Sequence, residues 1–478
     1  MTLRVGLIAV AAACLLACDG GGDGGGTTDT DGGSTSGNST SAGSAMVTTS
    51  PMTTGPVDCI AGQESCECLE GNCIGTLFCV ENVCLPGPDL DVPNDPIRVI
   101  AGLRVPIDAE VSADEFGWEQ TGGPEAVLTG VDLQQLLVDV PAAADPGDVL
   151  TLTLTATRNS VPASVDVTIE VVEAVFEEGL PGVDDPMQLG TPTAVSFRGG
   201  ELWAVMNEGF VSWFDIDFDE KLMEEVATHM GRHDIPGGPL GARLGRIPED
   251  ESDADYVLVA NAGSQSIEAV AINGGAIEGL ATETIDGDPL GPVRGIVRMD
   301  DELYFTNGEG GQLLVWDPDP PQPEDGSTGD AAIPPGARVL LSDLANPSAI
   351  TTGPEPGVLY VGINGQVIRV PILEGGVAGD ASPYLTFGEQ DDATLRVDGL
   401  RFDRAQNLYV GVPDASRLIV ARYVAGDSTS TIRNLTDAPE AFSDFAGLSF
   451  GENDFGGGTL YYGNASGRVG RVFVGLGD

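Results

Sequence analysis

The chain has 478 residues, and its 74 acidic and 21 basic side chains give a formal net charge of −53. Nucleic-acid binding depends on Lys and Arg contacts to phosphates, so this balance argues against a nucleic-acid partner. Hydrophobic residues make up 41% of the chain, which is enough for more than one core. The length is typical of about two to four domains.

The first eighteen residues have the features of an export signal. Arg4 precedes an apolar run from Val5 to Leu16, which is shorter than the roughly 20 residues needed to cross a bilayer. The run closes on Leu15-Leu16-Ala17-Cys18, which resembles a bacterial lipobox. The resemblance implies a signal peptide over residues 1–17 and a mature chain held to a membrane by acyl chains on Cys18. The alternative is an ordinary secretory signal cleaved after a small residue of Ala11-Ala12-Ala13.

Residues 18–57 predict a tether. After Cys18 the segment consists mostly of Gly, Ser, Thr and Asp. Such a composition buries too little apolar surface to offset the entropy of ordering the chain. We therefore expect a disordered leash between the anchor and the first folded unit.

Residues 58–87 form a cysteine-rich module. An even number of cysteines in a short exported segment indicates three disulfides, for which fifteen pairings exist. A zinc site is the alternative, but the segment has no Cys-x-x-Cys pair and no nearby His. The spacing loosely resembles small EGF-like modules, which suggests a rigid spacer. The six cysteines are Cys59, Cys66, Cys68, Cys73, Cys79 and Cys84.

Residues 88–174 predict an antiparallel β-sandwich. Apolar residues alternate with polar ones along 149–156 and 164–172, which places one face of each strand in a core. The stretch from Phe116 to Leu128 resembles the W-x-Q-x-x-G-P signature of PKD-like and related Ig-fold modules. The resemblance implies a spacer or adhesive unit, with Trp118 on a central strand between two sheets.

Residues 175–478 contain an imperfect repeat. The repeated unit contains a pair of apolar residues. A small-residue turn and an apolar strand precede most of these pairs, and another strand follows. A period near 50 residues resembles the NHL and SMP-30/gluconolactonase type of six-bladed β-propeller. A pair of β-sandwiches is the alternative. The repeated apolar pairs, 46 to 56 residues apart, are Leu202-Trp203, Val257-Leu258, Leu303-Tyr304, Leu359-Tyr360, Leu408-Tyr409 and Leu460-Tyr461.

The segment from Asp398 to Val410 resembles the D-G-L-x-x-D-x-x-G-N-L-Y-V segment of gluconolactonase-like proteins. In that family the first Asp is a ligand and base at a divalent metal, beside two Asn and one Glu from other blades. The resemblance therefore makes Asp398 a candidate ligand for Ca²⁺ or another divalent metal. The other three positions hold Ser348, Arg294 and Thr191-Pro192. One oxygen ligand in place of four holds such an ion poorly, which favours Asp398 as a residue of a blade turn.

Two further constellations offer metal ligands. His229 and His233 would form a zinc pair with Glu225 on a helix, but Gly231 and the Pro-Gly-Gly that follows indicate a loop. Alternating acidic residues at Asp215, Asp217 and Asp219 indicate a strand. They offer either calcium ligands or the solvated face of an edge strand. The Pro-rich acidic segment from Pro318 to Asp330 predicts an exposed loop.

The sequence as a whole predicts an all-β protein: a disordered tether, a small disulfide-rich module, an Ig-like β-sandwich and a six-bladed β-propeller. We expect a lipid-anchored protein of the bacterial cell envelope, periplasmic or surface-exposed, whose propeller binds an envelope protein, a glycan or a peptide without catalysis. One alternative is a metal-dependent, lactonase-like hydrolase in the propeller channel. A structural or adhesive stalk is the other.

Overall fold

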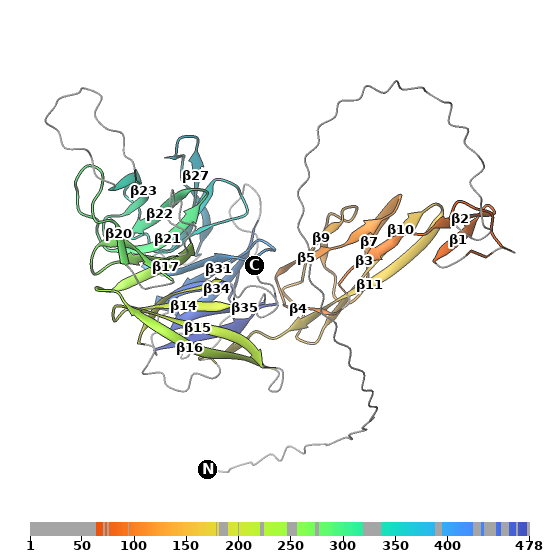
Figure 1. Ribbon diagram of the computed structural model, residues 1–478, viewed down its shortest axis with the longest axis horizontal. Helices are drawn as coiled ribbons and strands as arrows, with labels where there is room; N and C mark the ends of the chain where they lie inside the picture. The colour runs from red at the N-terminus through yellow and green to blue at the C-terminus, as the bar shows by residue number, and fades with distance from the viewer. Residues whose placement is uncertain are drawn as a thin grey trace, which may run out of the picture. The chain divides into compact units, whose positions relative to one another are not determined.

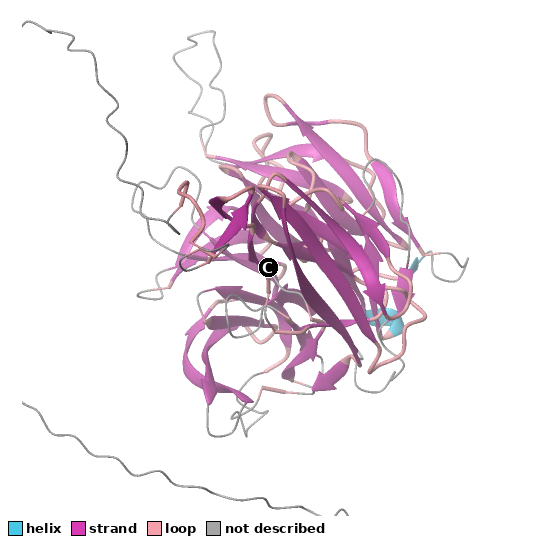
Figure 2. Ribbon diagram, turned by 90° about the vertical axis from the view of Figure 1, so that its right-hand side faces the viewer, coloured by secondary structure: helices cyan, strands magenta, loops and turns pink. Residues whose placement is uncertain are grey.

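A computed structural model of the chain consists almost entirely of β-strands (Figure 1; Figure 2). The described part includes a short 3₁₀ helix, η3 (Pro413–Ala415), and no helix there is long and apolar enough to cross a membrane. The predicted signal peptide, Cys18, the tether and the loop after Pro318 lie outside the described residues. The described residues are 64–69, 72–73, 76–93, 95–177, 179–180, 190–198, 200–219, 224–245, 256–272, 277–318, 336–387, 394–423, 432–434, 446–450, 458–464 and 467–475.

Disulfides hold the cysteine-rich segment together, as predicted. Strands β1 (Leu77–Val80) and β2 (Val83–Pro86) pair as a hairpin, and its turn residues Glu81 and Asn82 both have positive φ. The sulfurs of Cys68, Cys73 and Cys84 lie near one another, but all three are in disulfides, so they do not form a zinc site. Cys66 is also in a disulfide, and Cys59 lies outside the described residues. The two described pairs are Cys68–Cys79 and Cys73–Cys84.

Two sheets with a shared core follow the cysteine-rich segment. One sheet has the order β4-β11-β10-β7 and the other β5-β9-β8, and a short third sheet pairs β3 with β6. Alternate residues of β10 and β11 are buried, because one face of each strand meets the core and the other meets solvent. The strands are β3 (Asp89–Asp91), β4 (Ile97–Ile100), β5 (Arg104–Asp108), β6 (Glu110–Ser112), β7 (Glu115–Gly122), β8 (Val127–Thr129), β9 (Gln135–Asp139), β10 (Val149–Arg158) and β11 (Val161–Val172).

Trp118 is part of the sandwich core, but the prediction of a central strand was wrong. Its strand, β7, is at the edge of the four-stranded sheet. Burial is nevertheless nearly complete, because the chain around Val131 and Leu133 covers the open edge. The amide of Trp118 donates to the carbonyl of Val131 at 2.8 Å, and its indole N–H donates to the carbonyl of Leu133 at 3.3 Å. A loop therefore takes the place of the missing neighbour strand.

The rest of the chain forms six antiparallel blades, which confirms the predicted six-bladed propeller. The first blade contains β13 (Pro192–Arg198), β14 (Glu201–Met206), β15 (Phe210–Asp219) and β16 (Glu224–Asp234). The second contains β17 (Pro239–Gly245), β18 (Tyr256–Asn261), β19 (Ser266–Ala271) and β20 (Ile277–Ala281). The third contains β21 (Val293–Met299), β22 (Glu302–Asn307), β23 (Gln312–Asp317) and β24 (Gly336–Leu341). The fourth blade contains β25 (Ile350–Thr352), β26 (Val358–Ile363), β27 (Gln366–Leu373), β28 (Val377–Ala378) and β29 (Ser382–Thr386). The fifth contains β30 (Gly399–Phe402), β31 (Asn407–Val412), β32 (Arg417–Arg422) and β33 (Ile432–Asn434). The sixth contains β34 (Ala446–Phe450), β35 (Thr459–Asn464) and β36 (Arg468–Phe473).

The repeated apolar pair of the sequence lies on the second strand of every blade: β14, β18, β22, β26, β31 and β35. These strands are buried on both faces, because each blade packs against the next one on both sides. Both residues of a pair are therefore apolar, whereas a half-exposed strand would alternate. Burial on two faces explains why this signal is the strongest in the sequence.

A strand from before the first blade closes the ring. Strand β12 (Val175–Glu177) pairs with β36 and completes the last blade in the order β12-β36-β35-β34. The side chain of Glu177 accepts a hydrogen bond from Nε of Arg471 at 2.5 Å. The last blade thus contains strands from both ends of the propeller, so it links the ends of the ring.

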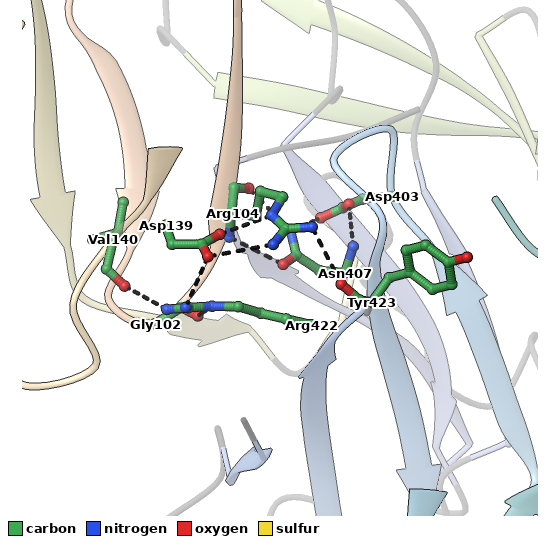
Figure 3. A network of polar contacts seen from close by, with 8 residues as sticks. All are labelled: Gly102, Arg104, Asp139, Val140, Asp403, Asn407, Arg422 and Tyr423. Atoms are coloured by element: carbon green, nitrogen blue, oxygen red, sulfur yellow. Dashed lines mark hydrogen bonds and ion pairs between the residues drawn. The ribbon is translucent and has the colours of Figure 1, made fainter. Parts of the chain in front are cut away.

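A polar network joins the sandwich to the propeller (Figure 3). The main-chain N–H of Arg104 donates to Oδ1 of Asn407 at 3.0 Å, and Nδ2 of Asn407 donates back to the Arg104 carbonyl at 3.1 Å. Arg422 donates from Nε to the Gly102 carbonyl at 2.8 Å and from Nη2 to the Val140 carbonyl at 2.7 Å. Apolar residues of both parts also share one buried cluster. The two parts therefore have a common core.

Candidate functional site in the propeller channel

The candidate site is a cavity at one end of the central channel. The first strands of neighbouring blades contact each other in a ring, and a cavity of about 280 Å³ lies where these strands begin. The cavity lies where β30 begins, whereas the polar network with the sandwich involves the turn after β30, at the other end of that strand. Each blade contributes at least one residue to the cavity, and one from each is Thr191, Leu240, Arg294, Ser348, Asp398 and Gly447.

Glycines set the width of the channel here. A Cβ at Gly241 would lie 1.8 Å from the carbonyl oxygen of Arg294, and one at Gly295 would lie 2.2 Å from the carbonyl oxygen of Ser348. No side chain fits at such distances, so the first strands touch through their main chains. The cavity is therefore bounded by backbone that has little freedom to move.

Charged groups of blades three and five meet in this cavity. Nε of Arg396 lies 2.7 Å from Oδ2 of Asp398, and both side chains are largely buried. Arg294 lines the same cavity, and its guanidinium lies over Gly308, where a Cβ would be 2.6 Å from Nε. The Nε of Arg294 is buried without a hydrogen-bond partner among the described residues. The cavity thus contains two guanidinium groups and one carboxyl group.

The surroundings of Asp398 act on its charge in opposite directions. Burial raises the pKa of the Asp398 carboxyl above its ordinary value, while the guanidinium groups of Arg396 and Arg294 lower it and the Asp414 carboxylate raises it. The raised pKa means that desolvation outweighs the attraction of both cations. The carboxyl is therefore harder to ionise than that of an exposed aspartate.

These residues do not fit a divalent cation. Asp398 is paired with Arg396, and a second guanidinium, that of Arg294, lines the same cavity. The hydroxyl of Thr191 donates to Glu208 at 2.8 Å, and that of Ser348 donates to the carbonyl of Val397. A divalent ion would find a single carboxylate, already paired with a guanidinium, and would meet two positive charges. We therefore derive no chemistry from a metal at Asp398.

The residues that the family resemblance aligned line one cavity, but the resemblance missed a further charged group there. Thr191, Arg294, Ser348 and Asp398 come from four blades, and all line the one cavity. Arg396 was missed, because it lies two residues before the family-like segment begins. The Arg-Val-Asp-Gly sequence that begins at Arg396 could have indicated it, because alternate residues of an extended backbone lie on one face and Arg396 is thus beside Asp398.

The histidine pair is neither helical nor in a loop. Both histidines lie on β16, and a bulge opposite Trp213 and Phe214 separates their partners. His233 stacks on Trp213 with ring centroids 4.6 Å apart, and His229 packs on Phe214 at 5.2 Å. Gly231 leaves space for the Trp213 ring, since a Cβ there would be 2.5 Å from it. The prediction of a loop was wrong because this glycine packs against an aromatic ring and does not form a turn.

The alternating acidic residues lie on a strand, as predicted, but not at an edge. Strand β15 pairs with both β14 and β16, so it is an inner strand of the first blade. Asp215 is partly buried, and the side chains of Asp217 and Asp219 lie outside the described residues. Ile216, between the first two, is buried in the blade core.

Comparison with known proteins finds likenesses of fold. No family model matches the chain, and no curated protein matches it. An auxiliary nutrient binding protein from Bacteroides thetaiotaomicron is 12% identical, with 80% of this chain and 98% of that chain covered and a TM-score of 0.41. Regucalcin, a calcium-binding protein from Agrobacterium tumefaciens, is 13% identical, with coverage of 62% and 93% and a TM-score of 0.40. Virginiamycin B lyase from Staphylococcus aureus is 13% identical, with coverage of 63% and 99% and a TM-score of 0.41. Sequence identities and TM-scores this low do not indicate the activity of this protein.

Proposed function

We propose that this protein is a lipid-anchored component of the bacterial cell envelope, periplasmic or surface-exposed, whose propeller is a non-catalytic binding module. The observation that carries the proposal is the channel cavity, in which guanidinium groups stand where a metal-dependent hydrolase needs oxygen ligands. The cavity is concave, enclosed by six blades and partly apolar, as ligand sites are. Its ligand would come from an envelope protein, a glycan, a peptide or a small solute.

The proposed location depends on the sequence before the first folded unit. Leu15-Leu16-Ala17-Cys18 supplies the thiol for acylation, and the Gly-rich segment after it supplies reach. Disulfides in the cysteine-rich segment agree with export to an oxidising compartment. The β-sandwich, for which we propose a PKD- or Ig-like origin, would act as the spacer that carries the propeller.

Cys18 is expected to be the site of lipid attachment. In bacteria grown with labelled palmitate, the wild-type protein should carry the label, and Cys18→Ser should lose it and remain in the uncleaved precursor form. Cys14→Ser is the matched control, because it removes the other cysteine of the signal and should keep the label. Labelling of the Cys18→Ser protein would contradict the anchor.

A further inference from the structure

The channel cavity concentrates positive charge in a protein that has little of it. The chain has 21 basic residues against 74 acidic ones, yet two of its arginines line this cavity with a single aspartate. Arg396 is paired with that aspartate, at 2.7 Å. The other arginine, Arg294, forms no ion pair with a described residue, although its charge acts on Asp398, and its Nε is buried without a hydrogen-bond partner there. Among the residues that line the cavity, basic side chains therefore outnumber acidic ones by one.

A buried Nε–H without a hydrogen-bond partner has lost its hydration without full compensation. The Nε of Arg294 lies close to Gly308, where a Cβ would be 2.6 Å from it. Because Arg294 lines the cavity without an ion pair to a described residue, its guanidinium can pair with a ligand there. The guanidinium fork matches the two oxygens of a carboxylate.

The walls of the cavity are apolar beside these charges. Ile296, Ile350, Leu400 and Leu448 line it together with the arginines. A hydrated inorganic ion would gain nothing from such walls, whereas the body of an organic anion would bury apolar surface there. A single excess positive charge also suits a monoanion better than a doubly charged phosphate.

We propose that the propeller channel binds a small organic monocarboxylate, whose carboxylate pairs with Arg294 and Arg396 and whose apolar body contacts the isoleucine and leucine walls. This inference deepens the proposed function and rests on it, since it names the ligand class of the same cavity. In the bound state the ligand carboxylate shares Arg396 with Asp398.

The test is a calorimetric titration of the purified full-length protein with benzoate, with benzamide as a neutral probe of the same shape. We expect benzoate to bind at one site at millimolar concentration or below, and benzamide not to bind measurably. Arg294→Gln should weaken benzoate binding about tenfold or more, because a charge-assisted hydrogen-bonded pair is lost. Arg298→Gln is the matched control on the same strand and should leave affinity within about twofold, because Arg298 pairs with Asp301 and does not line the cavity.

Asp398→Asn keeps the proposal testable if Arg294→Gln does not fold. This variant removes the carboxylate that competes for Arg396, so benzoate should bind more tightly than to the wild type. Absence of benzoate binding, equal binding of benzamide, or affinity that neither Arg294→Gln nor Asp398→Asn changes would overturn the proposal. None of these results would alter palmitate labelling at Cys18, so failure of the ligand class and failure of the proposed anchor are distinguishable.

Discussion

Asp139→Asn is expected to lower the free energy of unfolding by about 3 kcal/mol or more. Asp139 lies between two guanidinium groups, with Oδ1 2.7 Å from Nε of Arg104 and Oδ2 3.4 Å from Nη1 of Arg422 (Figure 3). All three side chains are at least 83% buried. Removal of the one carboxylate leaves two cations close together and largely out of water, which costs far more than an exposed pair contributes.

Glu170→Gln is the matched control for this prediction. Glu170 forms an ion pair with Arg98 in the same sandwich, but their side chains are 43% and 60% exposed. Its loss should cost at most about 0.5 kcal/mol. Urea denaturation followed by tryptophan fluorescence measures both variants. Equal costs for the two substitutions would contradict the role given to the network between sandwich and propeller.

The stability of the protein is expected to fall between pH 3.8 and about 7, where Asp403 is ionised in the unfolded chain but neutral in the folded protein. Burial raises the pKa of the Asp403 carboxyl from 3.8 to about 7, although it accepts hydrogen bonds from Asn407 and Tyr409 that oppose the rise. Folding therefore favours the neutral acid. The stability that it contributes is fully present below pH 3.8 and is lost as the pH rises through about 7. Between about pH 5 and pH 8 the loss amounts to about 3 kcal/mol.

The variant Asp403→Asn isolates this contribution from that of the many other carboxylates. Urea denaturation at about pH 5 and about pH 8 should show a decline in unfolding free energy that is about 3 kcal/mol smaller for Asp403→Asn than for the wild type. Asp301→Asn, at a side chain that is 89% exposed, should decline as the wild type does. A decline in Asp403→Asn equal to that of the wild type would show that burial does not hold this group neutral.

The propeller could be predicted because its signal repeats. An apolar pair such as Leu408-Tyr409 marks a strand with both faces buried, and the ring geometry requires such a strand in each blade. The cavity residues could be located because they begin the first strands, at the same place in successive repeats. A family-like segment around Asp398 then fixed their alignment with one another.

What the sequence could not predict depends on contacts between distant residues. Arg104 and Arg422 surround Asp139, yet nothing local to any of the three indicates the pairing. Trp118 was expected on a central strand, but a loop covers its edge strand, and loop positions have no periodic pattern. The sequence pattern predicted a turn at Gly231, because a glycine that packs against a tryptophan ring cannot be told from a turn glycine by the residues around it.

The charge of the cavity is the feature on which the proposed function depends, and calcium tests it most directly. We would titrate Ca²⁺ into the full-length protein and into Asp398→Asn by calorimetry. We expect weak binding to surface carboxylates that is the same in both proteins, because Arg294 and Arg396 exclude a divalent cation from the channel. A single tight site in the wild type that Asp398→Asn abolishes would contradict it and would favour a metal-dependent hydrolase.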